Sequence, residues 1–471
     1  PKGLIYGIRM MKTWLYDGTP ADYLRYEDVL AELKDGLEKG YFEQVIRTSF
    51  LENPHEALVT LAPSRTLGQE REAAQAAILA EKKAAMSTDE IAKVMDSCAA
   101  LKAAQEEADS EEALASIPIL ARSDIRPEAE RLPLAIRDLE GTQILYSDLE
   151  TNGIVYLNFY FPMAAVAQAD LPYAYLLAEM FGAVDTARHS YAELAMLRSL
   201  YTGGFGADIV AYTRAGEPDS LLPRFKLRAK VLRENLPRLF DLLAEIMTES
   251  DFSGAKRVRE LIDEEKTGME LSLQRAANQV VAARIAAYLT PSGRYAEVGG
   301  LPFHEFLRTF KEAFAARHAE MQAAFARILP QIFNASDLMV SVTAPAADYD
   351  EVAAQLTAFR QKLSSETFPT ASYTWEIAPK NEGLMTQSRV QYVAKGANFI
   401  KLGYEYTGVL RVLETLLRYD YFWTRIRVQG GAYGAMTQFN RNGFMIFSSY
   451  RDPNLAETFA VLDETADYVR S

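Results

Sequence analysis

The feature that most constrains the fold of this chain is a pattern of elements that occurs twice. In the first copy, a β-rich strand at Gly153–Phe161 is followed by helices and then by a glycine turn at Leu200–Gly206. In the second copy, a strand at Val390–Ala394 is followed by a helix at Gly408–Tyr421 and a glycine turn at Val428–Gly434. The strand-to-turn spacings are similar, at about 50 and 40 residues. This pattern predicts repeated units rather than one core.

Each unit mixes strands and helices in clusters. That mixture is typical of α+β domains, with helices packed on one face of a mostly antiparallel sheet. In the first unit, periodicity predicts strands at 143–147, 153–161, 225–231 and 338–344, and helices at 171–181, 191–200, 237–248, 254–289, 303–329 and 348–363. In the second unit, another strand is expected at 444–450 and a helical pattern at 453–471.

An abrupt change of composition separates these units from the start of the chain. Residues 66–116 contain 15 alanines, 11 acidic and 5 basic side chains, and no proline. Alanine, glutamate and lysine are strong helix formers, and Ser87–Glu90 reads as a capping box that starts a second helix. We therefore predict a helical-hairpin linker here, ending near the prolines at 118, 127 and 133.

The two ends of the chain indicate a fragment. Helices are expected at Leu4–Leu15 and Glu27–Leu51, followed by a strand at Glu56–Ala62, with no charged-then-apolar leader in front. The second repeat stops after about 100 residues, whereas the first runs for about 210. We therefore expect the 471 residues to belong to a longer polypeptide.

Composition excludes several function classes. The formal net charge of −14 disfavours broad binding to nucleic acid, and no apolar run is long enough for a membrane span. A single cysteine, Cys98, rules out an intrachain disulfide and favours a reducing compartment. We interpret Cys98 as a packing residue rather than a nucleophile, because its helix offers no catalytic base.

No metal site can be assembled from the four histidines. A zinc peptidase helix needs two histidines one turn apart with a glutamate as base. His55 is followed by Glu56 but then by Val59 at the position of the second ligand, and His304–Glu305 fails in the same way, with Arg308 there. His189 and His318 also lack partners at metal spacing. We therefore predict no metal ligands in this chain.

The segment around the second glycine turn is the best candidate for chemistry. Arg427 and Tyr433 flank the pair Gly430 and Gly431, so the two side chains could converge on one point. A guanidinium and a phenol hydroxyl are suitable donors for a peptide carbonyl or a developing oxyanion. The residues alone leave open an ordinary ion pair and a tyrosine on a sheet face.

Several motifs together resemble the presequence-protease branch of the pitrilysin/insulinase zinc metallopeptidases, the inverzincins. The two most specific are Ile426-Arg-Val-Gln-Gly-Gly-Ala-Tyr-Gly434 and Ser449-Tyr-Arg-Asp-Pro-Asn-Leu455. The others are Pro1–Gly7, Tyr41–Glu43, Thr151–Tyr156 and Thr202–Gly204, so the resemblance spans nearly the whole chain.

The resemblance implies the carboxy-terminal half of a clamshell peptidase built from four homologous α+β domains. Residues 1–64 would then end the second domain, 65–118 would form the helical-hairpin linker, 119–365 the complete third domain and 366–471 a truncated fourth domain. Zinc and its ligands would lie on the amino-terminal half of the same polypeptide, so this half alone would be inactive. Unfolded peptides would be the substrates, held by Arg427, Tyr433, Gly430 and Gly431.

Three further expectations follow, and two alternatives stay open. The resemblance implies a cytoplasmic protein in a bacterium, or an organelle-matrix protein in a eukaryote, with no nucleic-acid or membrane partner. A non-catalytic peptide-binding or assembly subunit of the same fold is the main alternative. A nucleotide-binding enzyme is the weaker one, because the helix precedes each glycine turn instead of following it.

Overall fold

The computed structural model describes residues 2–107, 109–129, 131–386, 388 and 390–471. Pro1, the first residue of the Pro1–Gly7 motif, lies outside the described residues. The chain forms two compact units, Pro1–Ala99 and Ala100–Ser471. In the described residues, no helix combines the length and the apolar character needed to cross a bilayer.

The first unit is helical. Its elements are α1 (Lys2–Trp14), α2 (Glu27–Leu37), α3 (Tyr41–Ile46), the π-helical η1 (Arg47–Leu51), α4 (Leu67–Ala85) and the start of α5 (Thr88–Glu106). The continuous helix predicted for Glu27–Leu51 was wrong, because Gly40 adopts a positive φ of 66° and separates α2 from α3. Glycine is the residue that tolerates this conformation without strain.

The strand predicted at Glu56–Ala62 was also wrong. This segment belongs to no ladder in the described chain, and Leu58 and Leu61 are each 95% exposed. Alternation of apolar residues favours a strand, but a strand forms only where another strand satisfies its backbone groups.

The capping box that starts α5 is confirmed. The Ser87 amide donates to Glu90 Oε2 at 2.8 Å, and the Glu90 amide donates to Ser87 Oγ at 3.3 Å. Two donors that the first turn would otherwise leave unsatisfied are therefore paired. The arrangement of α4 and α5 as a hairpin stays a prediction.

The second unit begins with α6 (Glu111–Ala115) and η2 (Arg122–Asp124) and contains a six-stranded sheet. The strand order is β1-β2-β6-β3-β5-β4, and β2–β6 is the one parallel pair among the described neighbours. The strands are β1 (Ala135–Leu139), β2 (Thr142–Asp148), β3 (Ile154–Pro162), β4 (Phe205–Tyr212), β5 (Leu222–Leu232) and β6 (Met339–Ala344).

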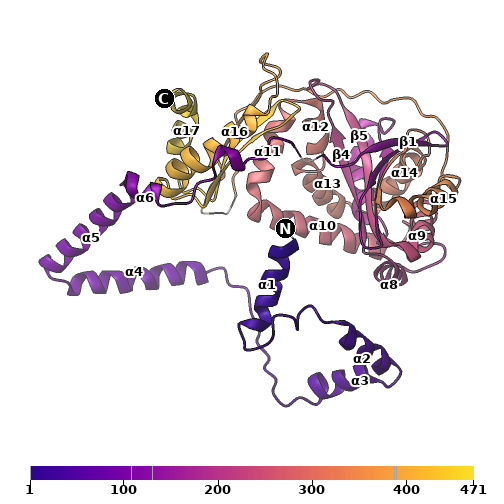
Figure 1. The fold of residues 1–471 in the computed structure, drawn as a ribbon, viewed down its shortest axis with the longest axis horizontal. Helices are drawn as coiled ribbons and strands as arrows, with labels where there is room; N and C mark the ends of the chain where they lie inside the picture. The colour runs from indigo at the N-terminus through magenta and orange to yellow at the C-terminus, as the bar shows by residue number, and fades with distance from the viewer. Residues whose placement is uncertain (1, 108, 130, 387, 389) are drawn as a thin grey trace. The chain divides into compact units, whose positions relative to one another are not determined.

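Helices cover one face of this sheet. Phe159 on β3 packs against Phe240 and Phe359, whose helices α9 and α15 lie beside the sheet in Figure 1. The helical elements are η3 (Gln168–Asp170), α7 (Leu171–Met180), α8 (Tyr191–Tyr201), η4 (Arg233–Asn235), α9 (Leu236–Glu249), α10 (Ala255–Arg275), α11 (Ala277–Ala287), α12 (Pro291–Glu297), α13 (Leu301–Glu312), α14 (Phe314–Ile332), η5 (Ala346–Asp348) and α15 (Tyr349–Arg360).

Two long helices predicted in this unit are each broken in the structure. The 254–289 helix divides into α10 and α11 at Ala276, and the 303–329 helix divides into α13 and α14 at Ala313. Both alanines leave helical geometry, with ψ near 34° and 38°. Alanine is the best helix former, so packing outweighs the local preference at both breaks.

A second, smaller sheet follows with the order β7-β9-β8, all antiparallel. Its strands are β7 (Ala394–Asn398), β8 (Gly434–Phe439) and β9 (Phe444–Tyr450), and its helices are α16 (Val409–Leu416), the π-helical η6 (Leu417–Gln429), α17 (Ala456–Asp463) and α18 (Thr465–Arg470). The strand predicted at Val390–Ala394 is confirmed only in part: Gln391 forms an isolated antiparallel bridge with Asp452, and the continuous ladder with β9 begins at Ala394. The α+β class, with helices on a mostly antiparallel sheet, is confirmed.

Candidate functional site

Arg427 lies in the last turn of η6, close to the point where the helix meets β8. Tyr421, Phe422 and Ile426 form the buried side of η6 and pack in the core of the small sheet. Burial of these three side chains fixes the helix, and it leaves Arg427 on the less buried side. The rigid helix therefore sets the position of the arginine backbone.

The two glycines allow the chain to leave η6 abruptly. A Cβ on Gly430 would come 2.6 Å from the carbonyl oxygen of Ile426, and Gly431 has a positive φ of 78°. The Gly431 amide donates to the Arg427 carbonyl at 3.0 Å, and the Ala432 amide donates to the Ile426 carbonyl at 3.1 Å. A glycine with left-handed backbone geometry commonly ends a helix, because the turn it forms brings amides that donate to the last helical carbonyls.

The guanidinium of Arg427 is held between two aromatic rings. Its Cζ lies 4.1 Å from the Trp423 ring centroid and 5.5 Å from the Tyr433 ring centroid. Its Nη1 donates to the Tyr433 carbonyl oxygen at 2.7 Å. In the described part of the chain, no carboxylate forms an ion pair with Arg427. The structure thus brings Arg427 and Tyr433 together and holds the cation by stacking and one backbone contact.

Tyr433 presents its side chain to solvent beside this arginine. The side chain is 65% exposed, and its ring makes an edge contact with Tyr450 at a centroid distance of 5.9 Å. Its amide donates to the Tyr450 carbonyl at 3.0 Å, which fixes the backbone to β9. Its hydroxyl forms no hydrogen bond within the described residues, so this donor is available to a ligand.

A buried polar network in the segment after β9 supports the glycine turn. The Asn454 side-chain amide donates to the Gly430 carbonyl at 2.5 Å. Asp452 is fully buried. Its carboxylate accepts a hydrogen bond from the Asn454 backbone amide at 2.9 Å and another from the Thr458 hydroxyl at 2.7 Å. The sequence alone assigned no role to these residues or to Trp423, although Asp452 and Asn454 lie in the Ser449–Leu455 motif. The signals were the Asp-Pro-Asn run after β9 and an aromatic residue four positions before the arginine.

The first glycine turn has a different architecture, although its sequence is similar. Gly203 and Gly204 exchange backbone hydrogen bonds with Lys230 of β5, at 2.9 Å and 3.3 Å. The positions equivalent to Arg427 and Tyr433 are Leu200 and Gly206. The arginine–tyrosine pair therefore occurs at the second glycine turn and not at the first.

The histidines take part in ordinary contacts. In the described residues, no cluster of three histidine, cysteine, aspartate or glutamate side chains has the geometry to hold a metal ion. Three of the rings contact other groups: His189 Nδ1 lies 2.9 Å from Glu245, His304 Nε2 lies 3.3 Å from Glu270, and His318 Nε2 lies 2.9 Å from the Phe252 carbonyl.

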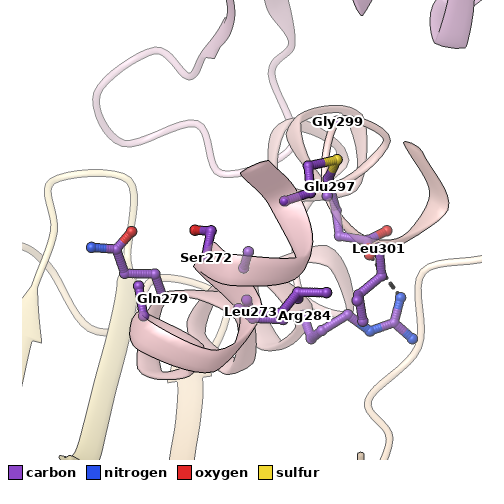
Figure 2. A pocket seen from close by; sticks show the side chains of 12 residues that line it. Ser272, Leu273, Gln279, Arg284, Glu297, Gly299 and Leu301 are labelled. Carbon is purple, nitrogen blue, oxygen red and sulfur yellow. Dashed lines mark hydrogen bonds and ion pairs between the residues drawn. The ribbon is translucent and has the colours of Figure 1, made fainter. Parts of the chain in front are cut away.

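One pocket of about 220 Å³ lies among α10, α11, α12 and α13 (Figure 2). Arg284 forms part of its wall, and its Nη1 contacts the buried Glu297 at 2.8 Å while Nη2 contacts Glu382 at 2.8 Å. These charges are paired with each other, so the pocket offers a ligand mainly apolar contacts from residues such as Leu273 and Leu301. We interpret it as a gap at the break between α10 and α11.

The structure thus defines an α+β protein with two mainly antiparallel sheets, in which Arg427 and Tyr433 lie together beside the smaller sheet. The family model for the domain associated with subfamily C of the M16 peptidases matches residues 61–310, and the "PreP C-terminal domain" matches residues 381–471. The chain belongs to this M16-associated peptidase family, as the carboxy-terminal half of a presequence-protease-like protein. The resemblance seen in the sequence is confirmed.

Several relatives cover the whole of this chain. "Protein HypA" of Clostridium perfringens is 31% identical over 470 residues, which are 100% of this chain and 48% of that protein. "Presequence protease 1, chloroplastic/mitochondrial" of Arabidopsis thaliana is 28% identical over 478 residues, covering 100% of this chain and 44% of that protein. The chain therefore spans about half the length of the curated relatives it matches.

Among solved structures, a "peptidase M16 inactive domain" from Pseudomonas fluorescens is 14% identical to this chain. The match covers 72% of this chain and 80% of that one, with a TM-score of 0.49.

Proposed function

We propose that this chain is the zinc-less half of a metalloendopeptidase that hydrolyses unfolded peptides, and that it contributes Arg427 and Tyr433 to substrate binding. The observation that carries the proposal is the environment of Arg427. Its guanidinium is fixed by Trp423 and by the Tyr433 carbonyl, but it has no carboxylate partner among the described residues. A cation held in place and left without a counter-ion is suited to a ligand that supplies oxygen atoms.

The donors that remain on Arg427 suit a peptide carbonyl. Nη1 already donates to the Tyr433 carbonyl, whereas Nε and Nη2 form no hydrogen bond within the described residues. A guanidinium offers its donors in a rigid fork, and such donors stabilise negative charge that develops on a carbonyl oxygen. Arg427 would therefore bind the scissile or a neighbouring carbonyl and strengthen that contact in the transition state.

Tyr433, Gly430 and Gly431 would complete the binding site. The free hydroxyl of Tyr433 can donate to a second peptide oxygen from the same side of the sheet. The two glycines present backbone without side chains beside the arginine, which would let a peptide backbone approach closely. The Asn454 contact to the Gly430 carbonyl would keep that surface rigid.

Zinc would be held by the amino-terminal half of the same polypeptide. The described residues of this chain do not fit the metal, because they form no cluster of three ligands. When bound to the other half, zinc would supply an activated water for hydrolysis. By this proposal the chain alone is inactive, and it acts in the cytoplasm of a bacterium or in an organelle matrix.

The domain assignment is part of the same proposal. Residues 1–64 would end the second domain, 65–118 would form the linker, 119–365 the third domain and 366–471 part of the fourth. The six-stranded sheet, which lies within 135–344, and the small sheet, which lies within 394–450, are compatible with this division.

The test is substitution in the full-length enzyme. Arg427→Ala should lower kcat/KM for peptide hydrolysis by about 10²-fold, which is the usual cost of removing one donor to a developing oxyanion. Arg425→Ala is the matched control, because Arg425 lies on the same helix but forms an ion pair with Glu464 at 3.2 Å. Equal rates for the two variants would refute the role of Arg427.

A further inference from the structure

Strand β5 carries basic side chains on the face of the large sheet that the helices do not cover. Its apolar residues Phe225, Leu227, Ala229 and Val231 are buried against the helices. Since side chains alternate along a strand, the residues between and beside them point to the open face. Four of these five residues are cations, Arg224, Lys226, Arg228 and Lys230, and the fifth is Leu232.

Two of the four cations are neutralised by carboxylates and two are not. Arg224 pairs with Asp337 at 2.6 Å, and Arg228 pairs with Asp208 of β4 at 2.8 Å. Lys226 and Lys230 form no ion pair within the described residues. An excess of positive charge therefore remains on this strand, in a chain whose overall net charge is −14.

Each lysine is held in a defined position. The ammonium of Lys226 lies 5.6 Å from the ring centroid of Tyr160, its direct neighbour on β3. The aliphatic stem of Lys230 passes over Gly203, where an added Cβ would come 2.8 Å from Lys230 Cγ. These contacts reduce the freedom of two side chains that are normally mobile, so less entropy is lost when they bind a ligand.

The neighbouring strand adds groups that suit a polypeptide. Tyr156, Asn158 and Tyr160 of β3 stand directly opposite Lys230, Arg228 and Lys226 in the antiparallel register. Tyr212 of β4 contacts Tyr160 at a centroid distance of 6.2 Å. The open face thus combines cations with tyrosine rings and an amide, which can pack against and hydrogen-bond an extended chain.

We propose that this surface, formed by Lys226, Lys230, Tyr156, Asn158 and Tyr160, binds an acidic, extended segment of polypeptide. The occupant follows from charge complementarity. Lys226 and Lys230 are four residues apart on β5, or about 13 Å, which is also the spacing of residues i and i+4 in an extended peptide. Carboxylates four positions apart, which an alternating acidic peptide provides, would therefore match the two unpaired lysines.

This inference rests on the proposed function in one respect: the acidic segment would belong to a peptide substrate. It names the substrate class as peptides with an acidic stretch. The binding itself requires no catalysis, because all the residues that form the surface lie in this chain.

Binding of labelled peptides to the 471-residue chain tests the proposal. A peptide of alternating Glu and Thr should bind more tightly than the matched Gln–Thr and Lys–Thr peptides, and added salt should weaken it. The double variant Lys226→Gln/Lys230→Gln should raise the Kd of the Glu–Thr peptide about fivefold, as expected for two exposed charge contacts. Asp208→Asn, which frees Arg228, should lower that Kd about threefold.

A matched control uses two lysines from the helical side of the unit. Lys256 lies on α10 and Lys362 follows α15, so Lys256→Gln/Lys362→Gln removes the same charge from another surface. This control should leave the Kd unchanged. Equal affinity for the Glu–Thr and Gln–Thr peptides, or equal effects of the two double variants, would overturn the proposal. Neither result depends on the hydrolysis rates of Arg427 variants, so the two proposals can fail separately.

Discussion

Removal of the Trp423 ring is the perturbation whose consequence can be worked out most fully. The ring centroid lies 4.1 Å from Arg427 Cζ, which is a close cation–π contact. Trp423 is itself partly exposed, and contacts of this kind at exposed sites contribute about 0.5–1 kcal/mol. If that contact holds Arg427 in its binding orientation, Trp423→Ala should lower kcat/KM of the full-length enzyme by about twofold to fivefold.

The effect of Trp423→Ala on the rate should also depend on whether Arg427 is present. Trp423 would be a positioning residue, because it acts through Arg427 and not on the substrate. In an Arg427→Ala background, Trp423→Ala should therefore cost almost nothing, and a double-mutant cycle should recover most of the coupling, on the order of 0.5–1 kcal/mol for a cation–π pair. Trp423→Phe should restore part of the rate.

Peptide hydrolysis by the four members of the cycle, together with the thermal stability of each, is the measurement. A loss of the same size in both backgrounds would show that Trp423 acts independently of Arg427. In that case the stacking seen in the structure would not be what orients the arginine.

Two other predictions concern stability. Gly430→Ala should lower the free energy of unfolding by about 2 kcal/mol in urea denaturation, because the new Cβ would lie 2.6 Å from a backbone oxygen. Gly434→Ala, whose Cβ would have no neighbour nearer than 4.0 Å, should cost less, and a reversed order would contradict this account of the turn. Partial desolvation and the nearby Glu265 carboxyl raise the pKa of Glu179, whose residue as a whole is exposed, from 4.5 to about 7. The resulting destabilisation is absent below about pH 4.5, grows as the pH rises and is complete above about pH 7. Glu179→Gln should thus stabilise the chain by about 1 kcal/mol near pH 8, after allowance for solvent screening, and by little near pH 4. Unfolding curves at both pH values check this, and an equal gain in stability at both would contradict the raised pKa of Glu179.

Elements defined by local pattern could be predicted from the sequence. The alternation of Val155, Leu157, Phe159 and Phe161 predicts a half-buried strand, and β3 has that pattern of burial. The Ser87–Glu90 box needs only neighbouring residues, and its hydrogen bonds are present. In both cases the chemistry that decides the structure lies within a few residues.

The errors arose where distant parts of the chain decide the structure. Ala276 and Ala313 carry no breaking signal, yet helices end at both. Residues 56–62 have the composition of a strand but no partner in the described chain to pair with. A pattern of residues reports local preference, and it does not report which neighbour will be available.

The candidate site could likewise be predicted only where neighbouring residues decide its structure. The double glycine and its flanking arginine and tyrosine could be singled out because their residue types are suggestive in sequence. The support from Asp452, Asn454 and Thr458 could not, since it depends on how the segment after β9 returns to the turn. The stacking of Trp423 on Arg427 joins residues four positions apart on one helix, so this contact had a local signal in the sequence.

The structure of the full-length protein with a slowly hydrolysed peptide bound is the measurement that tests the central claim most directly. The account predicts a peptide carbonyl oxygen at about 3 Å from Nε or Nη2 of Arg427, with the Tyr433 hydroxyl donating to the same peptide. A bound peptide that makes no contact with Arg427, or an Arg427 paired with a carboxylate of the other half, would contradict it.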